Sequence, residues 1–397
     1  MRTAGPSSRT VVAALGLVQI LAWGSSFYFP AVFAAPIAAE TGWPLAWVVG
    51  GVSIGLLVGG LISPLVGRLI ARHGGRPLLG ASSLLFAIGL VGIGLASSLA
   101  VYLAAWCVVG LGMGTGLYDA VFAALGRRYG QGARAAIATL TLFGGFASTV
   151  CWPLSALLLE QIGWRGACLI YAGLHLLLGL PLQLLVLRGD GQPAAADAAP
   201  THDKGSSNPP ARRGVTVLLG LILSLAAGIG SIVVVHLLTF LQAGGIGMAA
   251  AVSLGMLFGP AQVGARMVER LFGQHYHPVW TLLAAALLML IGLVLLLAAP
   301  AFAALAIILY AGGYGISWIA RGTVPLAIFG AARYPLVISR LALPSLVVQA
   351  LAPSAGALLI TAFGAAPTIA ILATLAALNL ALAAALMGTS RPPAEEY

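Results

Sequence analysis

A basic stretch between two long apolar segments decides the fold of this chain: residues 67–76, Gly-Arg-Leu-Ile-Ala-Arg-His-Gly-Gly-Arg. It holds three arginines in a protein with only 19 lysines and arginines in 397 residues. Half a chain length later, residues 264–273 (Gly-Ala-Arg-Met-Val-Glu-Arg-Leu-Phe-Gly) repeat the spacing of Arg68 and Arg72. Short basic connections orient membrane helices. The repeat therefore predicts a duplicated membrane protein with both basic stretches on the cytoplasmic side.

The composition places the chain in a lipid bilayer. Hydrophobic residues make up 60% of it, charged residues 7%, and the mean hydropathy is +1.05. A soluble domain has about 45–50% apolar and about 25% charged residues. The net charge of +10 does not indicate a nucleic-acid partner, because the arginines lie in short connections and form no basic patch interleaved with aromatic residues.

Twelve apolar segments are long enough to cross the membrane, for which a helix needs about 20 residues. The first of them is too long to be a signal peptide. The sequence thus predicts an all-α membrane protein with 12 transmembrane helices in two pseudo-symmetric six-helix bundles. The predicted spans are residues 11–37, 45–67, 77–98, 101–125, 135–159, 166–187, 214–241, 247–265, 279–299, 302–329, 336–362 and 366–388.

The distribution of lysine and arginine predicts the topology. These residues gather in alternate connections, and the opposite set of connections holds Arg165 alone. The positive-inside rule then puts both termini in the cytoplasm, and we expect a multi-pass protein of a bacterial-type cytoplasmic (inner) membrane. One long polar stretch separates the two groups of six spans. The predicted domains are an N-terminal bundle at 1–188, a cytoplasmic linker at 189–213, a C-terminal bundle at 214–390 and a cytoplasmic tail at 391–397.

Over nearly its whole length the chain resembles the major facilitator superfamily, which carries Gly-x-Leu-Ala-Asp-Arg-x-Gly-Arg-Arg/Lys after its second helix. That pattern is matched by Gly67, Leu69, Arg72, Gly74 and Arg76. The resemblance implies six plus six helices, a cytoplasmic linker and a conformational latch at the basic stretches. The expected latch residues are Gly67, Arg68, Arg72, Gly74, Arg76, Arg266, Glu269 and Arg270.

Departures from the family pattern leave the subfamily open. Ala71 stands where the family usually has Asp, and Glu269 occupies the equivalent position of the second stretch. Val108 lies near the place of the family's fourth-helix arginine. Of the fifth-helix antiporter pattern, only Pro153 and the small Ala156 remain. The chain therefore resembles either a monocarboxylate-porter-like or an efflux-type member.

Two ionisable residues lie deep in the predicted spans, where an unpaired charge costs about 2.5–3.5 kcal/mol. Asp119 lies in the fourth span, and Arg321 lies at similar depth in the tenth, its repeat partner. The resemblance places these helices on opposite sides of a central cavity, and we expect the pair to close its cytoplasmic gate. Alternatively, Asp119 meets water or the nearby Arg127 and Arg128, or carries a proton, and Arg321 attracts an anionic substrate.

Further candidates lie in spans that the resemblance places at the cavity. Gln19, Trp23 and Ser26 follow one another at about one helical turn in the first span, so they share a face. His236 in the seventh span carries an imidazole, which can change charge near neutral pH. Each of these residues also has a simpler interpretation as a packing or hydrogen-bonded residue.

An aromatic pair, Tyr314 and Trp318, precedes Arg321 by one turn in the tenth span. Such a pair beside a cation suits a small, partly apolar anion better than a sugar, which needs many hydrogen-bonding side chains. Packing is again the simpler interpretation. The leading prediction is a secondary active transporter that moves a small solute, preferably a small organic anion, by alternating access.

Two other functions remain as alternatives. One is efflux of drug-like or metalloid compounds, for which Cys151 beside Trp152 is the thiol argument; the other is a non-transporting membrane receptor or scaffold. An enzyme is not expected, because the spans offer no paired acids and no nucleophile–base set. No metal and no cofactor are expected, and proton coupling stays open. The expected partners are a small-molecule substrate and the lipid bilayer, with no nucleic acid, and we expect a monomer.

Overall fold

The computed structural model describes residues 7–188 and 209–389. Within these ranges every regular element is a helix, which confirms the predicted all-α class. Most of the predicted linker, residues 189–208, and the predicted tail, residues 391–397, lie outside the described residues. The last part of the predicted linker is helical, because α10 begins at Pro209. A proline suits the first turn of a helix, where its missing N–H is not needed.

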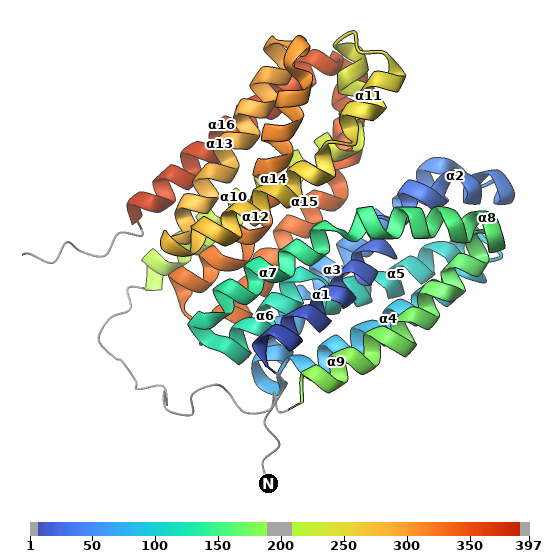
Figure 1. Ribbon diagram of the computed structural model, residues 1–397, viewed down its shortest axis with the longest axis horizontal. Helices are drawn as coiled ribbons and strands as arrows, with labels where there is room; N and C mark the ends of the chain where they lie inside the picture. Colours follow the sequence, from blue (N-terminus) through green and yellow to red (C-terminus); the bar gives the residue numbers. More distant parts are fainter. Residues whose placement is uncertain (1–6, 189–208, 390–397) are drawn as a thin grey trace, which may run out of the picture. The chain divides into compact units, whose positions relative to one another are not determined.

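Seven of the predicted spans are single continuous helices (Figure 1). In the described ranges, nine helical stretches are long and apolar enough to cross a membrane, and the longest of these, Leu99–Val186, contains three predicted spans. The seven single helices are α3 (Leu45–His73), α4 (Gly75–Gly94), α10 (Pro209–Ala243), α13 (Pro278–Ala298), α14 (Ala303–Phe329), α15 (Tyr334–Phe363) and α16 (Ala365–Thr389).

The other five predicted spans are built from shorter helices. The first is interrupted from Ser25 to Phe29, and the fourth at Leu117, which is extended with φ −79° and ψ −174°. Gly163 has φ 71° and ψ 173° and turns the chain between the fifth and sixth spans inside α8. These helices are α1 (Ser8–Gly24), α2 (Pro30–Thr41), α5 (Leu99–Gly116), α6 (Tyr118–Tyr129), α7 (Ala133–Gly145), α8 (Ala147–Leu174), the π-helix η2 (His175–Gly179), α9 (Leu180–Val186), α11 (Met248–Gly255) and α12 (Phe258–Phe272), with short 3₁₀ turns η1 (Gly130–Gly132), η3 (Gly273–His275) and η4 (Pro300–Phe302).

The first basic stretch is mostly helix rather than loop. The predicted second span ends at residue 67, but α3 continues to His73 before Gly74, at φ 83°, turns the chain into α4. The predicted boundary is wrong because Arg72 and His73 suit a helical last turn, where positive charge complements the exposed carbonyls. Long basic side chains also extend toward water while their backbone stays helical.

Packing divides the chain into two compact units. Unit 1 comprises Met1–Ala194 and Gly330–Ala350, and unit 2 comprises Ala195–Phe329 and Leu351–Tyr397. The first part of α15 therefore groups with unit 1, although it follows the predicted linker in sequence. The predicted bundles at 1–188 and 214–390 describe a duplication, which is a different criterion from compactness, and they stay predictions.

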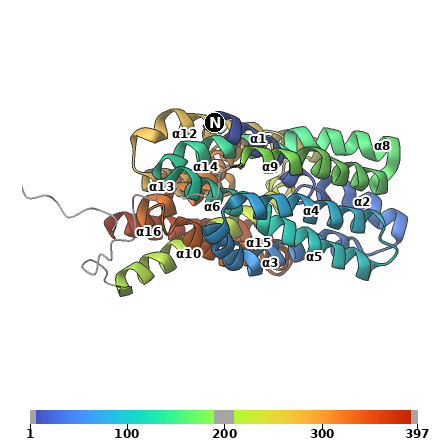
Figure 2. The same cartoon turned by 90° about the horizontal axis from the view of Figure 1, so that it is seen from below.

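Glycines let the helices of each unit approach closely. In unit 1, α4 and α5 lie side by side (Figure 2), and a Cβ at Gly89 would lie 2.8 Å from the backbone nitrogen of Val109. In unit 2, a Cβ at Gly313 of α14 would lie 2.7 Å from the Ala285 carbonyl oxygen of α13. Small residues at helix contacts are typical of membrane proteins, because they allow backbones to pack directly.

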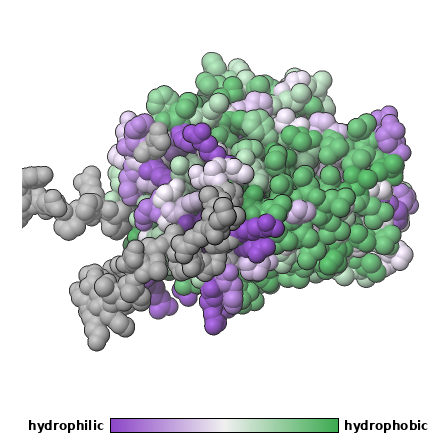
Figure 3. All heavy atoms as spheres, turned by 60° about the horizontal axis from the view of Figure 1, so that its bottom comes forward, coloured by the Kyte–Doolittle hydropathy of each residue, from purple (hydrophilic) through white to green (hydrophobic). Residues whose placement is uncertain are grey.

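The exposed surface carries large apolar side chains. Leu61, Ile88 and Leu177 are 66%, 61% and 83% exposed. Figure 3 shows one broad apolar area, with hydrophilic residues gathered beyond its edges. A soluble protein rarely exposes apolar patches of such extent, so this surface is suited to contact with lipid.

Candidate functional site

The break in the fourth span is stabilised by a side chain from α1. Because Leu117 leaves the helix, the Gly116 carbonyl loses the N–H that a continuous helix would offer it. Gln19 Nε2 donates to this oxygen at 2.6 Å, and Trp23 Nε1 donates to Gln19 Oε1 at 3.1 Å. The Gln19 amide thus holds the end of α5 at the break, and a role in binding substrate stays a prediction.

The other predicted first-span residues are also buried. The Trp23 ring packs on that of Tyr118, the first residue of α6, with centroids 5.0 Å apart. Ser26 is fully buried, and its hydroxyl donates to the Ala22 carbonyl at 2.5 Å. The face that these residues share therefore lies inside unit 1.

Asp119 is the second residue of α6 and is half-buried. A carboxylate in the first turn of a helix is favoured by the unpaired N–H groups there. The broken span therefore provides an electrostatic reason for an acid at this depth. Asp119 belongs to unit 1 and Arg321 to unit 2, and their pairing stays a prediction.

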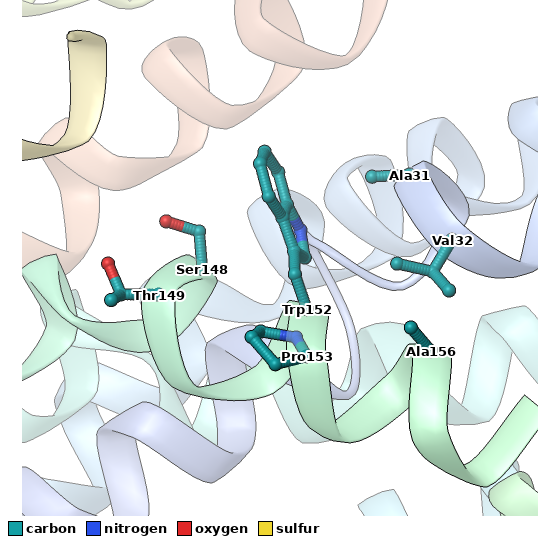
Figure 4. A pocket seen from close by; sticks show the side chains of 7 residues that line it. All are labelled: Ala31, Val32, Ser148, Thr149, Trp152, Pro153 and Ala156. Carbon is teal, nitrogen blue, oxygen red and sulfur yellow. The ribbon is translucent and has the colours of Figure 1, made fainter. Parts of the chain in front are cut away.

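A pocket in unit 1 opens between α2 and α8 (Figure 4). It has a volume of about 470 Å³, within the range of about 300–1,000 Å³ that small-molecule sites have. The Trp152 ring stands between the hydroxyls of Ser148 and Thr149 on one side and the alkyl side chains from α2 on the other. The lining residues are Ala31, Val32, Ser148, Thr149, Trp152, Pro153 and Ala156.

Tyr28 packs against the Trp152 ring, and the neighbouring thiol of Cys151 lies outside the pocket. Tyr28 meets the Trp152 ring edge to face, with centroids 6.1 Å apart. Cys151 is only 2% exposed, and its Sγ donates to the Ile20 carbonyl at 3.5 Å. The thiol therefore does not line the pocket, and the thiol argument for a metalloid substrate loses its geometric support.

In unit 2, the predicted aromatic pair and its cation lie together on α14. Arg321 is 4% exposed, and its guanidinium carbon lies 5.4 Å from the centre of the Trp318 ring. The Tyr314 and Trp318 rings meet edge to face at 6.2 Å, and Phe258 of α12 packs on Tyr314 at 6.1 Å. Helical periodicity accounts for these contacts along α14, and a role of these three residues in binding substrate stays a prediction.

His236 of α10 is half-buried and is tied to α15. Its Nε2 lies 2.9 Å from the Pro353 carbonyl oxygen. A carbonyl only accepts, so Nε2 carries a proton in this contact. Because the contact occupies one ring nitrogen, the hydrogen-bonded packing interpretation accounts for this histidine, and proton transfer through it stays a prediction.

The two basic stretches have different environments. In the first, Arg68 and Arg72 are exposed, and Arg76 Nε donates to the Leu184 carbonyl at 3.0 Å. In the second, Arg266 is 3% exposed and donates from Nε to the Gly315 carbonyl at 2.9 Å. The remaining latch residues of the second stretch, Glu269 and Arg270, are half-buried, and Glu269 Oε1 accepts from the Thr281 hydroxyl at 2.7 Å.

His175 lies in the π-helix η2 and is not one of the predicted site residues. It is fully buried and stacked on Phe86, and its Nε2 lies 2.9 Å from the Ser25 hydroxyl at the break of the first span. Its Nδ1 has no hydrogen-bond partner among the described residues. A lone histidine in an apolar segment carries no pattern that would reveal such a contact.

One protein-family profile matches most of the chain, and solved structures share its fold. The profile of the Major Facilitator Superfamily matches residues 15–275, and no curated protein sequence matches the chain. Among solved structures, the E. coli fucose:proton symporter FucP has a TM-score of 0.74 at 14% identity, covering 98% of this chain and 100% of its own. The human organic anion transporter MFSD10 has a TM-score of 0.71 at 16% identity, covering 95% and 100%. The proton:xylose symporter XylE has a TM-score of 0.69 at 16% identity, covering 94% of each chain.

Proposed function

The chain belongs to the Major Facilitator Superfamily, and from that premise we propose that it moves a small organic anion across the membrane by alternating access. The family and the twelve-helix fold make it a membrane transporter and not an enzyme. The fold does not select the solute, because it is shared by a human organic anion transporter and by two proton-coupled sugar symporters.

The observation that carries the proposal is the buried guanidinium of Arg321. A cation that is 4% exposed in an apolar unit attracts a carboxylate more strongly than it would in water, because the low dielectric weakens screening. The planar guanidinium also has paired N–H donors whose geometry matches a carboxylate. The Trp318 face fixes the guanidinium from one side, so less ordering is needed when an anion binds.

The cytoplasmic gate proposed from the sequence has its own test. We propose that Asp119 and Arg321 form and break a contact during the cycle. Asp119→Arg combined with Arg321→Asp should recover part of the transport lost in each single variant, measured as solute uptake. Failure of the exchange to recover any uptake would remove the gate and leave the anion proposal standing.

Several further features belong to the same proposal. We propose a monomer in an inner membrane with both termini in the cytoplasm, without a bound cofactor, and with transport coupled to protons through Asp119 or His236. An imposed pH gradient should then accelerate uptake in proteoliposomes. His236→Gln and Asp119→Asn, measured separately, should show which side chain carries the dependence on the gradient.

The main experiment compares anions with neutral solutes. Purified protein in liposomes should take up acetate or benzoate and leave xylose outside. Arg321→Gln should lower kcat/KM for the anion by about 10- to 100-fold, because a hydrogen bond to a charged group is worth about 1.5–3 kcal/mol. Arg321→Lys should lose less, since it keeps the charge without the planar fork. Uptake of xylose by the wild type, or equal anion uptake in Arg321→Gln, would contradict the proposal.

A further inference from the structure

We propose that the pocket between α2 and α8 binds a flat apolar ring with a hydrogen-bonding substituent, so that the preferred anions are aromatic carboxylates rather than short-chain ones. This inference rests on the proposed function, because it narrows the class of organic anion. It concerns unit 1 alone, whereas the proposed cation belongs to unit 2.

The size of the pocket sets the size of the group it holds. A cavity of about 150 Å³ holds one benzene molecule, and the pocket has about 470 Å³. A single ring therefore fills about a third of the pocket, and a two-ring system still fits. An acetate or lactate ion would leave most of the apolar lining in contact with water, so it gains little from the pocket.

The chemistry of the lining selects an uncharged, flat group. None of the seven lining side chains is charged, and burying a charge without a partner is strongly unfavourable. The carboxylate of the solute must then lie outside this pocket. Trp152 provides an aromatic surface on which a second ring can stack or meet edge to face, and Tyr28 packs against the Trp152 ring edge to face.

Polar groups on the side of the Trp152 ring away from α2 favour a ring that carries a hydrogen-bonding substituent. Pro153 has no N–H, so the carbonyl of Thr149, four residues earlier in α8, lacks its helical donor. The hydroxyls of Ser148 and Thr149 lie on the same side of the Trp152 ring (Figure 4). A hydroxyl or amino group on the ring finds an acceptor here, whereas a plain hydrocarbon ring leaves these polar groups to water.

Binding to the purified full-length protein in lipid nanodiscs tests the pocket. The probes are acetate, benzoate, 4-hydroxybenzoate and neutral benzamide. Trp152→Ala should weaken benzoate and benzamide about tenfold, because aromatic contact and buried area are both lost. Acetate should change by less than about twofold, as for a substitution outside its site. Trp47→Ala, at a tryptophan of α3 that is 55% exposed, is the matched control for partition of rings into lipid.

Two more variants test the pocket even if Trp152→Ala fails to fold. Ala156→Leu fills the pocket from an exposed position and should block both rings while acetate binding persists. Ser148→Ala should reduce the preference for 4-hydroxybenzoate over benzoate. Equal weakening of acetate and benzoate, or ring binding unaffected by Trp152→Ala and Ala156→Leu, would overturn the inference.

The neutral probe separates this inference from the proposed function. If the wild type takes up no carboxylate but binds benzamide in a Trp152-dependent manner, the anion proposal fails and the pocket stands. If carboxylates are taken up and benzamide binding is the same in wild type, Trp152→Ala and Ala156→Leu, the pocket fails and the anion proposal stands.

Discussion

The two basic stretches share their arginine spacing, yet they hold their helices in opposite ways. At the end of α3, Arg68 is exposed and the close contact is made by Gly67, beside which Ser339 and Pro335 of α15 pack. At the end of α12, the arginine itself, Arg266, is buried in the packing. A duplicated spacing thus fixes where a residue lies along its helix, but the partner helix decides which residue is buried.

The positions of the glycines explain why different residues are buried in the two stretches. In the first stretch the residue without a Cβ is Gly67, on the basic helix itself. In the second stretch Ala265 occupies that place, and the glycines are on the partner helix α14 instead. A Cβ at Gly312 would lie 3.4 Å from the Ala265 Cβ, and one at Gly315 would lie 2.9 Å from the Gln262 Cα. This close approach brings the Gly315 carbonyl within reach of Arg266.

The largest expected effect distinguishes the two arginines. Arg266→Ala should destabilise the protein by about 2–4 kcal/mol, because it leaves the buried Gly315 carbonyl and Gln262 amide without their charged donor. Arg68→Ala, at an exposed position, should stay within about 0.5 kcal/mol. Thermal unfolding in one detergent, with both variants side by side, measures the difference.

Arg266→Lys sharpens this comparison. Lysine keeps the charge but not the planar arrangement of donors, so it should restore only part of the stability. Full restoration would mean that charge alone matters at this position. Equal losses in Arg266→Ala and Arg68→Ala would mean that the burial of Arg266 has no energetic consequence, and the contrast between the stretches would disappear.

The second effect concerns Gly67, which directly precedes Arg68, and Gly264, which lies two residues before Arg266. A Cβ at Gly67 would lie 2.6 Å from the Pro335 carbonyl oxygen, whereas one at Gly264 meets nothing within 4 Å. Gly67→Ala should therefore cost about 1–3 kcal/mol through overpacking. Gly264→Ala should gain up to about 1 kcal/mol, since glycine is a poor helix former. Opposite signs in thermal unfolding support the comparison, and a loss of stability in both variants would count against it.

The length of the apolar segments predicted the fold because membrane helices must satisfy their own backbone hydrogen bonds. The interruptions inside the spans were not predictable in the same way. Gly112, Gly114 and Gly116 precede the break, but this pattern does not show that Leu117 is the residue that leaves the helix. The break is held by Gln19, which is 97 positions away from Gly116 in the chain. The role of Gln19 is decided by that distant carbonyl, and no spacing pattern contains it.

The candidate site residues also divide into contacts that the sequence predicts and contacts that it does not. The neighbourhood of Arg321 was predictable, because Tyr314 and Trp318 share its helix and helical periodicity brings them together. The pocket beside Trp152 was not, because its walls come from α2 and α8, which are separated in sequence and meet only after folding. Its one local signal is the interval from Thr149 to Pro153, which leaves a carbonyl without its donor.

The smallest effect tests whether Glu269 stabilises the second stretch, at the position where the first stretch has Ala71. Glu269 Oε1 accepts a hydrogen bond from Thr281 at 2.7 Å, whereas Ala71 in the first stretch has no side chain that can do so. A double-mutant cycle with Glu269→Ala and Thr281→Val should give a coupling of about 1 kcal/mol. Glu269→Gln should keep most of it, because an amide oxygen still accepts. Ala71→Asp should change stability by no more than about 0.5 kcal/mol. A coupling near zero would mean that the hydrogen bond from Thr281 to Glu269 adds nothing to stability, and the acid would then not contribute to the difference between the two stretches through this contact.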